Sequence, residues 1–112
     1  FTTLAAAVAP AADTTAPSVP TGITASRRTR AISVAWRAST DNVAVAGYRI
    51  DVATDSGFTR FASTYQNRDV GAVTAYSVTG LTSRTTYYVR LRAYDAAGNV
   101  SASSATVSAR VN

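Results

Sequence analysis

Tyrosine and arginine alternate along one stretch of this sequence. Tyr88, Arg90, Arg92 and Tyr94 occupy every second position, and Arg49 belongs to an earlier alternating stretch. Side chains two residues apart in a β-strand point to the same face, so these residues share one surface. Aromatic rings stack on sugar faces, and guanidinium forks suit carboxylate or phosphate groups. The five side chains are therefore a candidate binding face for a glycan or an anion.

A purely structural interpretation of the same residues stays open. Tyrosine and arginine also suit a solvated sheet face, where Asp51 would form an ordinary cross-strand ion pair. A fold alone never assigns a function. Variants therefore have to test the binding hypothesis, which predicts that Tyr88→Ala or Arg92→Ala lowers the affinity.

The amino-acid inventory argues against catalysis. The sequence contains no His, Cys, Lys, Glu or Met, which removes the usual general base, the thiol nucleophile and the Schiff-base amine. An enzyme of this composition would need Ser or Asp to act without those partners. Imidazole and thiolate ligands are missing too, and the aspartates are too scattered for a calcium loop. We predict no catalytic residue, no metal site and no cofactor.

The charge balance is basic but weak. Lys and Arg number 11 against 6 for Asp and Glu, for a net charge of +5, yet charged residues are only 15% of the chain, below the roughly 25% of an average domain. Arg27, Arg28 and Arg30 form a small basic cluster, expected in the loop between the first two strands. A nucleic-acid reader shows a longer basic track with interleaved aromatics. The cluster is interpreted as a solvated loop, and no nucleic-acid partner is predicted.

Short alternating segments separated by turn residues position these side chains, and no window keeps helical spacing. Strands are predicted over residues 31–37, 48–52, 73–78, 87–94 and 105–111, with an irregular piece from Phe58 to Tyr65. The apolar face that holds Tyr48 should oppose Trp36. About seven strands at this spacing predict an all-β protein, a seven-stranded immunoglobulin-like β-sandwich.

Residues 1–16 differ in composition from the rest. They are rich in Ala, Thr and Pro and hold few large side chains, which is typical of an extended linker. Two other interpretations stay open: a signal-peptide remnant, with small residues at positions 9–11, or a strand donated to a neighbour. The folded domain is predicted over residues 17–112. No apolar run has the length of a membrane span.

Several motifs stand at set places within the predicted domain. They are the entry APSVPTG from position 16, Trp36 on its strand, ASTDNV from position 38 leading into Gly47 and Tyr48, and Leu81 with Thr85 and Tyr87 before the alternating strand. With these motifs the chain resembles a fibronectin type III domain of the bacterial extracellular type. The resemblance implies structural roles for Trp36, Tyr48, Leu81 and Tyr87, the last two in a tyrosine corner. Ser83 stands where many members have proline, which leaves that corner looser.

The resemblance implies a non-catalytic module. In bacterial chitinases, cellulases and similar enzymes, such domains sit between catalytic and carbohydrate-binding domains and set their distance and orientation. We therefore expect a secreted or cell-surface protein whose partners are adjacent domains of the same polypeptide, with a polysaccharide or another surface polymer as a further partner. No Arg-Gly-Asp tripeptide occurs, so integrin binding is not expected.

A structural subunit is the second hypothesis. Phe1 and Leu4 are apolar residues that a plain linker does not need, and open sheet edges accept an added strand through main-chain hydrogen bonds. Residues 1–12 would then be an inter-subunit strand, and the chain would self-assemble into an extracellular filament, or a surface or virion lattice. A chain starting at Asp13 would lose that assembly.

Overall fold

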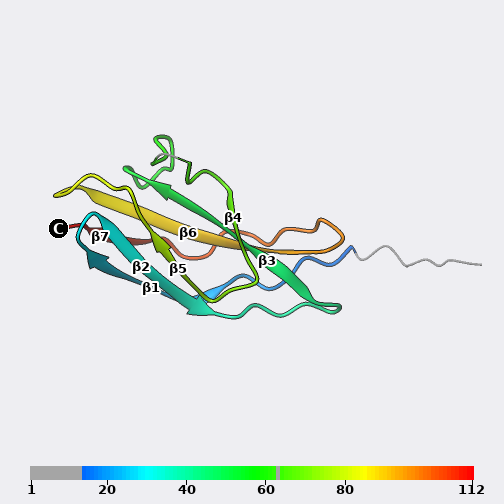
Figure 1. The fold of residues 1–112 in the computed structure, drawn as a ribbon. Helices are drawn as coiled ribbons and strands as arrows, with labels where there is room; N and C mark the ends of the chain where they lie inside the picture. The colour runs from blue at the N-terminus through cyan, green and yellow to red at the C-terminus, as the bar shows by residue number, and fades with distance from the viewer. Residues whose placement is uncertain (1–13, 63) are drawn as a thin grey trace, which may run out of the picture.

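Two antiparallel sheets build the protein in the computed structural model, which describes residues 14–62 and 64–112. Alternating apolar and polar residues give each strand one face for the core. One sheet has the order β1-β2-β5, with β1 (Thr21–Arg28), β2 (Ala31–Arg37) and β5 (Ala75–Val78). The other has the order β4-β3-β6-β7, with β3 (Val45–Ala53), β4 (Arg68–Gly71), β6 (Thr86–Asp95) and β7 (Val107–Arg110). The predicted all-β, seven-stranded sandwich is confirmed (Figure 1).

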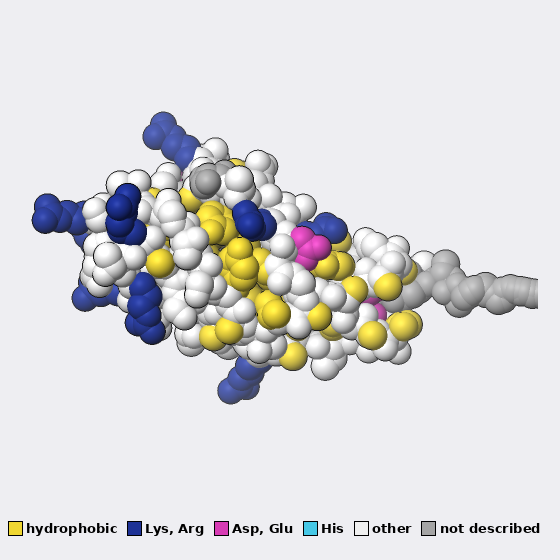
Figure 2. Space-filling view, viewed as in Figure 1, with side chains coloured by type: hydrophobic (Ala, Val, Ile, Leu, Met, Phe, Trp, Pro, Cys, Tyr) yellow, Lys and Arg dark blue, Asp and Glu magenta, His cyan; other side chains and the backbone are white. Residues whose placement is uncertain are grey.

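The chain enters the sandwich at one end and leaves it at the other (Figure 1). At the entry end, ahead of β1, Ser18 N donates to Thr40 O at 2.7 Å. At the exit end, Asn112 N donates to Arg28 O, at the far end of β1, at 3.2 Å. The two ends also differ on the surface, since arginine side chains gather toward the exit end (Figure 2). The two ends of the sandwich thus differ: the chain enters at one and leaves at the other, and arginine side chains gather at the second.

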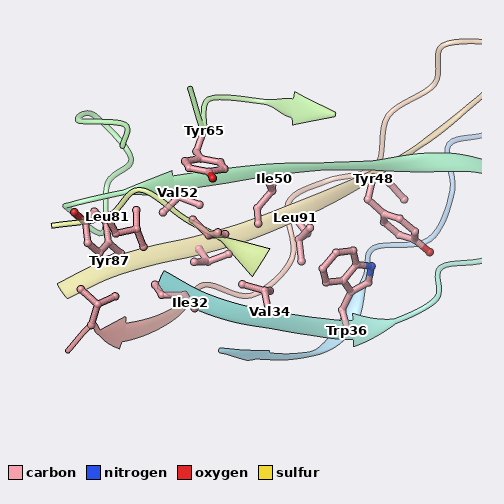
Figure 3. Close-up of a cluster of buried hydrophobic side chains, with 14 residues drawn as sticks. Ile32, Val34, Trp36, Tyr48, Ile50, Val52, Tyr65, Leu81, Tyr87 and Leu91 are labelled. Atoms are coloured by element: carbon pink, nitrogen blue, oxygen red, sulfur yellow. The ribbon is translucent and has the colours of Figure 1, made fainter. Parts of the chain in front are cut away.

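Side chains from both inner faces fill the space between the sheets (Figure 3). Ile32 and Val34 of β2 and Ile50 and Val52 of β3 are fully buried, as is Leu91 of β6. Each side chain of this size stabilises the fold by about 1.5–3 kcal/mol when it leaves water. The predicted inward positions of these three strands are therefore the centre of the core.

Trp36 and Tyr48 close the core at the entry end. Their rings meet edge to face with centroids 5.5 Å apart, so the predicted opposition of the two residues is confirmed. Tyr48 Oη accepts a hydrogen bond from Ser39 N at 2.7 Å. A buried tyrosine keeps its apolar body in the core in this way while its polar end is satisfied.

The fourth strand differs from the prediction. β4 lies at Arg68–Gly71, whereas the irregular piece from Phe58 to Tyr65 belongs to a connection that touches β3 through a bridge between Phe61 and Ala53. β4 is four residues long and begins with two exposed charged residues, so alternation gives no sign of it. Short, charged edge strands protect a sheet from pairing with other chains.

The basic cluster also lies elsewhere than predicted. Arg27 and Arg28 are the last two residues of β1, and Arg30 alone of the three lies in the two-residue turn before β2. The loop interpretation is wrong for the first two because Arg27 pairs with Ile32 and Arg28 with Ala31, which carries the ladder to the end of the hairpin. The strands β5 and β7 are shorter than the predicted segments 73–78 and 105–111.

Candidate binding face on the four-stranded sheet

The adjacent strands β3 and β6 bring the predicted face together. Their register places Arg49 opposite Arg92 and Asp51 opposite Arg90. Alternate residues share a face, so Tyr88 and Tyr94 join them. We call this surface the outer face, made of Arg49, Asp51, Tyr88, Arg90, Arg92 and Tyr94 with Asp69 of β4. Its residues on β6 are half-buried rather than fully exposed.

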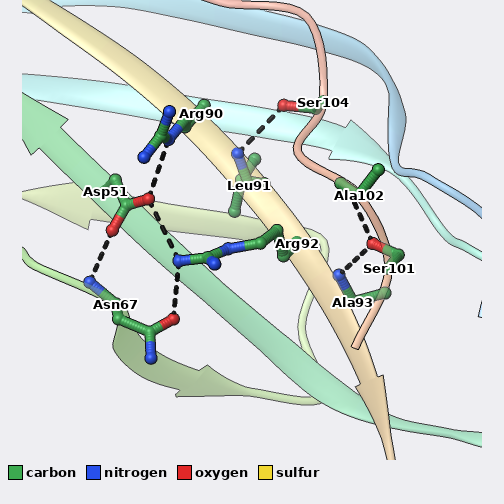
Figure 4. Close-up of polar contacts among 9 residues, drawn as sticks. All are labelled: Asp51, Asn67, Arg90, Leu91, Arg92, Ala93, Ser101, Ala102 and Ser104. Carbon is green, nitrogen blue, oxygen red and sulfur yellow. Dashed lines mark hydrogen bonds and ion pairs between the residues drawn. The ribbon is translucent and has the colours of Figure 1, made fainter. Parts of the chain in front are cut away.

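Asp51 is the centre of the outer face and is 2% exposed. Its Oδ2 accepts hydrogen bonds from Arg90 Nε at 2.9 Å and from Arg92 Nη2 at 3.2 Å. Its Oδ1 accepts one from Asn67 N (Figure 4). A buried carboxylate is costly unless it is paired and hydrogen-bonded, and here three donors reach it. Asp51 therefore engages two of the arginines predicted to bind a ligand.

The connection between β3 and β4 covers these arginines from outside. Arg90 Cζ lies 4.0 Å from the ring centroid of Phe58, which is 6% exposed. Arg92 Nη2 donates to Asn67 Oδ1 at 2.8 Å. Phe58 and Asn67 have φ values of 54° and 52°, a left-handed conformation that is uncommon for residues with a side chain. The backbone of the connection thus places both side chains against the ion pairs.

Tyr94 lies across β3 toward β4. Its hydroxyl is 2.8 Å from both carboxylate oxygens of Asp69 and donates to that group, and Arg49 Cζ lies 4.7 Å from the ring centroid. Gly47 leaves room for the ring, because a Cβ there would be 2.5 Å from the hydroxyl. The hydrogen bonds from Gly71 N and from Tyr94 lower the pKa of Asp69. The bond to Asp69 in turn raises the pKa of Tyr94.

The polar groups of the outer face are thus largely paired within the chain. Arg90 and Arg92 share Asp51, while Tyr94 is bonded to Asp69. Tyr88 differs, since it lies between Ala53 of β3 and Ser108 of β7 and takes no part in these contacts. A ligand would have to replace existing partners before gaining new ones, which reduces its net affinity.

Sequence reasoning missed the groups that complete the outer face. Asp69 lies on the unpredicted β4, and Phe58 and Asn67 lie in the connection before it. The bonds of Asp69 and Asn67 to β6 join residues 25 positions apart, which local alternation does not encode. Gly47 is a signal in the sequence for the contact with Tyr94, because a glycine inside a strand often marks a place where another group approaches the backbone closely.

Asp55 has a lowered pKa as well. Its Oδ2 accepts a hydrogen bond from Thr59 Oγ1 at 2.7 Å, which is the main cause, and Arg60 N donates to Oδ1 at 3.0 Å. This is a capped turn in the connection after β3, in which the carboxylate is bonded to a hydroxyl group and to backbone N–H groups of its own turn. Over residues 14–62 and 64–112, no group of three or more His, Cys, Asp or Glu side chains could hold a metal ion. Within that same part of the chain, no helix is long and apolar enough to cross a membrane.

Comparison with known proteins places this sandwich in a family. The family model described as Fibronectin type III domain matches residues 18–110. The chain belongs to the fibronectin type III family. Among its sequence relatives are Exoglucanase A of Cellulomonas fimi, 48% identical over 102 residues, and Chitinase Chi52 of Paenibacillus xylanexedens, 45% identical over 103 residues. Each match covers 88% of this chain but 10% of the first relative and 17% of the second.

Solved structures share the fold of this fibronectin type III domain. The chicken CNTN1 FN1–FN3 domains match with a TM-score of 0.69 at 23% identity, over 97% of this chain and 34% of that one. The FN5 domain of Drosophila Lar matches with a TM-score of 0.64 at 23% identity, over 85% of this chain and 96% of that one. At such identities the likeness concerns the fold alone.

The fibronectin type III domain buries the four residues for which the resemblance implies structural roles. They are between 2% and 5% exposed: Trp36, Tyr48, Leu81 and Tyr87. Tyr87 Oη accepts a hydrogen bond from Thr82 N, five residues upstream, at 2.9 Å. This bond ties the connection before β6 to the strand itself, as a tyrosine corner does. It thereby helps to position β6, which carries most of the outer face.

Proposed function

We propose that this fibronectin type III domain is a non-catalytic spacer and interaction module of a secreted or cell-surface bacterial protein, accessory to a polysaccharide-degrading enzyme. The observation that carries the proposal is that the chain enters and leaves at opposite ends of the sandwich (Figure 1). Such a module separates whatever precedes it from whatever follows it. The ten residues of β6 span about 33 Å at the usual rise of a strand.

The sequence relatives support this function. The matched segment is a small share of the exoglucanase and of the chitinase, so those proteins contain much more than a domain of this kind. The absence of His, Cys, Lys and Glu from the sequence supports a non-catalytic module. A polymer-degrading enzyme works where its polymer lies, which supports a place outside the cell.

The proposed organisation is a linker over residues 1–16 and the folded module over residues 17–112. Pro17 and Pro20 are buried, and Ser18 is hydrogen-bonded to Thr40. These contacts support a module that begins at position 17. The first thirteen residues of the linker lie outside the described residues.

Solution size tests the spacer proposal. Light scattering should give a monomer both for the full chain and for a chain beginning at Asp13. When residues 17–112 join two reporter domains, small-angle scattering should show a narrow distribution of separations, about 33 Å longer than for directly fused reporters. A Gly/Ser linker of the same length is the control and should give a broad distribution. An equally broad distribution for residues 17–112 would exclude a rigid spacer.

Assembly of the full chain alone would instead favour the structural-subunit hypothesis. Its inter-subunit strand, residues 1–12, lies outside the described residues. The two sheets do have open edges, at β1 and β5 in one and at β4 and β7 in the other. Loss of assembly in the chain beginning at Asp13 would then identify the first twelve residues as the donated strand.

Weak glycan or anion binding through the outer face remains a further proposal. Tyr88 is its sharpest probe, because the side chain is half-buried and takes no part in the ion-pair network. Tyr88→Ala should therefore lower the affinity for a ligand without disturbing the fold. Arg92→Ala should also lose affinity, but it removes a partner of Asp51 as well. Unchanged binding in both variants would end this proposal.

A further inference from the structure

Five exposed arginines surround the exit end of the sandwich. They come from three separate parts of the chain that the main chain holds together: Asn112 N donates to Arg28 O at 3.2 Å, Arg30 N donates to Asn112 O at 3.3 Å, and Arg84 N donates to Val111 O at 3.1 Å. Figure 2 shows arginine side chains gathered around this end. We call this surface the arginine pole: Arg27, Arg28, Arg30, Arg84 and Arg110, all exposed.

Among the described residues, no aspartate side chain forms an ion pair with an arginine of the pole. Within residues 14–62 and 64–112, the ion pairs are those that Asp51 makes with Arg90 and Arg92 on the outer face. Asp41, in the connection after β2, and Asp95, at the end of β6, lie at the entry end. Asp55 follows the end of β3 that pairs with Tyr88, toward the exit end, and its carboxylate accepts hydrogen bonds from Thr59 and Arg60. Because five arginines are collected at the exit end, the field of the domain attracts anions there.

Two of the pole arginines stand where a side chain is unfavourable. Arg30 has φ of 56° and Arg84 has φ of 59°, in the left-handed region that glycine and asparagine adopt most easily. The turns themselves are fixed, since Leu81 N donates to Arg30 O at 3.1 Å and Arg84 N is bonded to Val111 O. Folding alone would favour glycine at both positions. Strained backbone held in place is a reason to look for a function of the side chain.

We propose that the arginine pole binds a linear anionic polysaccharide, whose carboxylate or sulfate groups repeat along the chain. Guanidinium forks donate paired hydrogen bonds to the oxygens of such groups, and a cluster of arginines with no ion pair among the described residues matches a repeating negative charge. This goes beyond the spacer function, which needs no ligand. It also places anion binding at the end of the sandwich rather than on the outer face, where the arginines already have partners.

Two other polyanions fit the pole less well. Single-stranded nucleic acid binds through aromatic side chains on which bases stack, whereas the exposed neighbours of the pole arginines in the two turns are Thr29, Thr82 and Ser83. Membrane surfaces are held by apolar side chains beside the basic ones. The exposed large apolar residues of the described chain, Val19, Val43 and Val73, do not belong to the pole either. Charge without stacking or apolar anchors therefore favours a polysaccharide.

The double variant Arg30→Gly/Arg84→Gly separates binding from folding. It removes two charges and relieves two strained positions, so the melting temperature should rise while affinity falls. The probes are polygalacturonate and heparin, titrated at several salt concentrations with neutral dextran as the blank. We expect affinity to drop at least about tenfold and the salt dependence to weaken by roughly 1.5 in log–log slope, as for other polyanions. The matched control is Arg37→Gln/Arg68→Gln, with the same change of net charge away from the pole and less than a twofold effect expected.

Other outcomes would overturn the proposal. Equal losses in both double variants would mean diffuse attraction to net charge. Tighter binding to single-stranded DNA, or to phosphatidylglycerol vesicles over phosphatidylcholine ones, would assign the pole to a different partner. Absence of binding to both polysaccharides would refute it directly. If the glycine variant fails to fold, Arg27→Gln/Arg110→Gln removes two charges from strand positions and must show the same loss.

Discussion

The contacts of Asp51 explain how two arginines can stand two residues apart on β6. Their mutual repulsion is offset because one carboxylate oxygen accepts from both guanidinium groups. The carboxylate is 2% exposed while the arginine side chains are 29% and 28% exposed. The carboxylate is therefore buried, whereas both guanidinium groups are partly solvated. Removal of the carboxylate should thus lower the free energy of unfolding more than removal of either arginine.

Asp51→Asn should lower the free energy of unfolding by about 2–3 kcal/mol, because it leaves two partly buried arginines without their counter-charge. Urea denaturation measures the change. Asp69→Asn is the matched control, since Asp69 is exposed and should cost less than about 1 kcal/mol. Similar losses in the two variants would mean that the burial of Asp51 has no energetic consequence.

Gly47→Ala should lower the free energy of unfolding by about 1–3 kcal/mol through overpacking. The added Cβ would lie 2.5 Å from Tyr94 Oη and 2.8 Å from Cζ, so the ring must leave its place and its bond to Asp69. In a Tyr94→Ala background the same change should be neutral or slightly stabilising, because alanine orders a strand more readily than glycine. Additive losses in the double-mutant cycle would contradict this explanation.

Whole strands could be predicted where alternation is strong and one face is buried. β2, β3 and β6 meet that condition, and their inward residues are those of the core. β4 could not be predicted, because a short edge strand has little buried face to impose a pattern. β7 is shorter than its apolar pattern suggests because the segment before it bonds to β6 in another way.

That segment closes the edge of β6 with serine side chains. Ser101 Oγ accepts from Ala93 N at 3.0 Å, and Ser104 Oγ accepts from Leu91 N at 2.9 Å (Figure 4). The main chain forms hydrogen bonds at the same two places: Ser101 N donates to Ala93 O, and Ser104 N donates to Leu91 O. Residues 101–104 thus satisfy the edge of β6 without forming a strand.

Ser101→Ala and Ser104→Ala should each cost about 1–3 kcal/mol of stability, because each leaves a buried backbone donor of β6 unsatisfied. Hydrogen exchange should accelerate at the amides of Ala93 and Leu91 respectively. Ser103→Ala, next to both and exposed, is the control and should change neither quantity. Unchanged exchange in the first two variants would show that the hydroxyl groups do not protect the strand.

At the scale of the molecule, the sequence could predict which residues share the outer face. It could not predict whether the polar groups of that face are free or already paired. A period of two placed the residues of the outer face together. Whether they were free depended on partners far along the chain, such as Asp51 for Arg90, 39 positions away. The arginine pole could not be predicted for the same reason, because Arg28, Arg84 and Arg110 come together only where β1 and β7 end and β6 begins.

The whole domain should have a flat stability profile near neutral pH and weaken at both extremes. It has no histidine, so no side chain has an ordinary pKa between about 5 and 8. Asp55 and Asp69 have pKa values lowered from 3.8 by their hydrogen bonds; a lowered folded-state pKa stabilises the fold above the unfolded value, and that stability is lost as pH falls below it.

Tyr94 has a pKa raised from 10.0 by its bond to Asp69, so its contribution is present below the unfolded value and is lost as pH rises past it. Melting temperature measured across the pH range should therefore fall at the acid end and at the alkaline end. Tyr94→Phe should flatten the alkaline limb. Asp69→Asn should flatten part of the acid limb and, because Asp69 raises the pKa of Tyr94, part of the alkaline limb as well. An alkaline limb that is unchanged in Tyr94→Phe would mean that another tyrosine controls it.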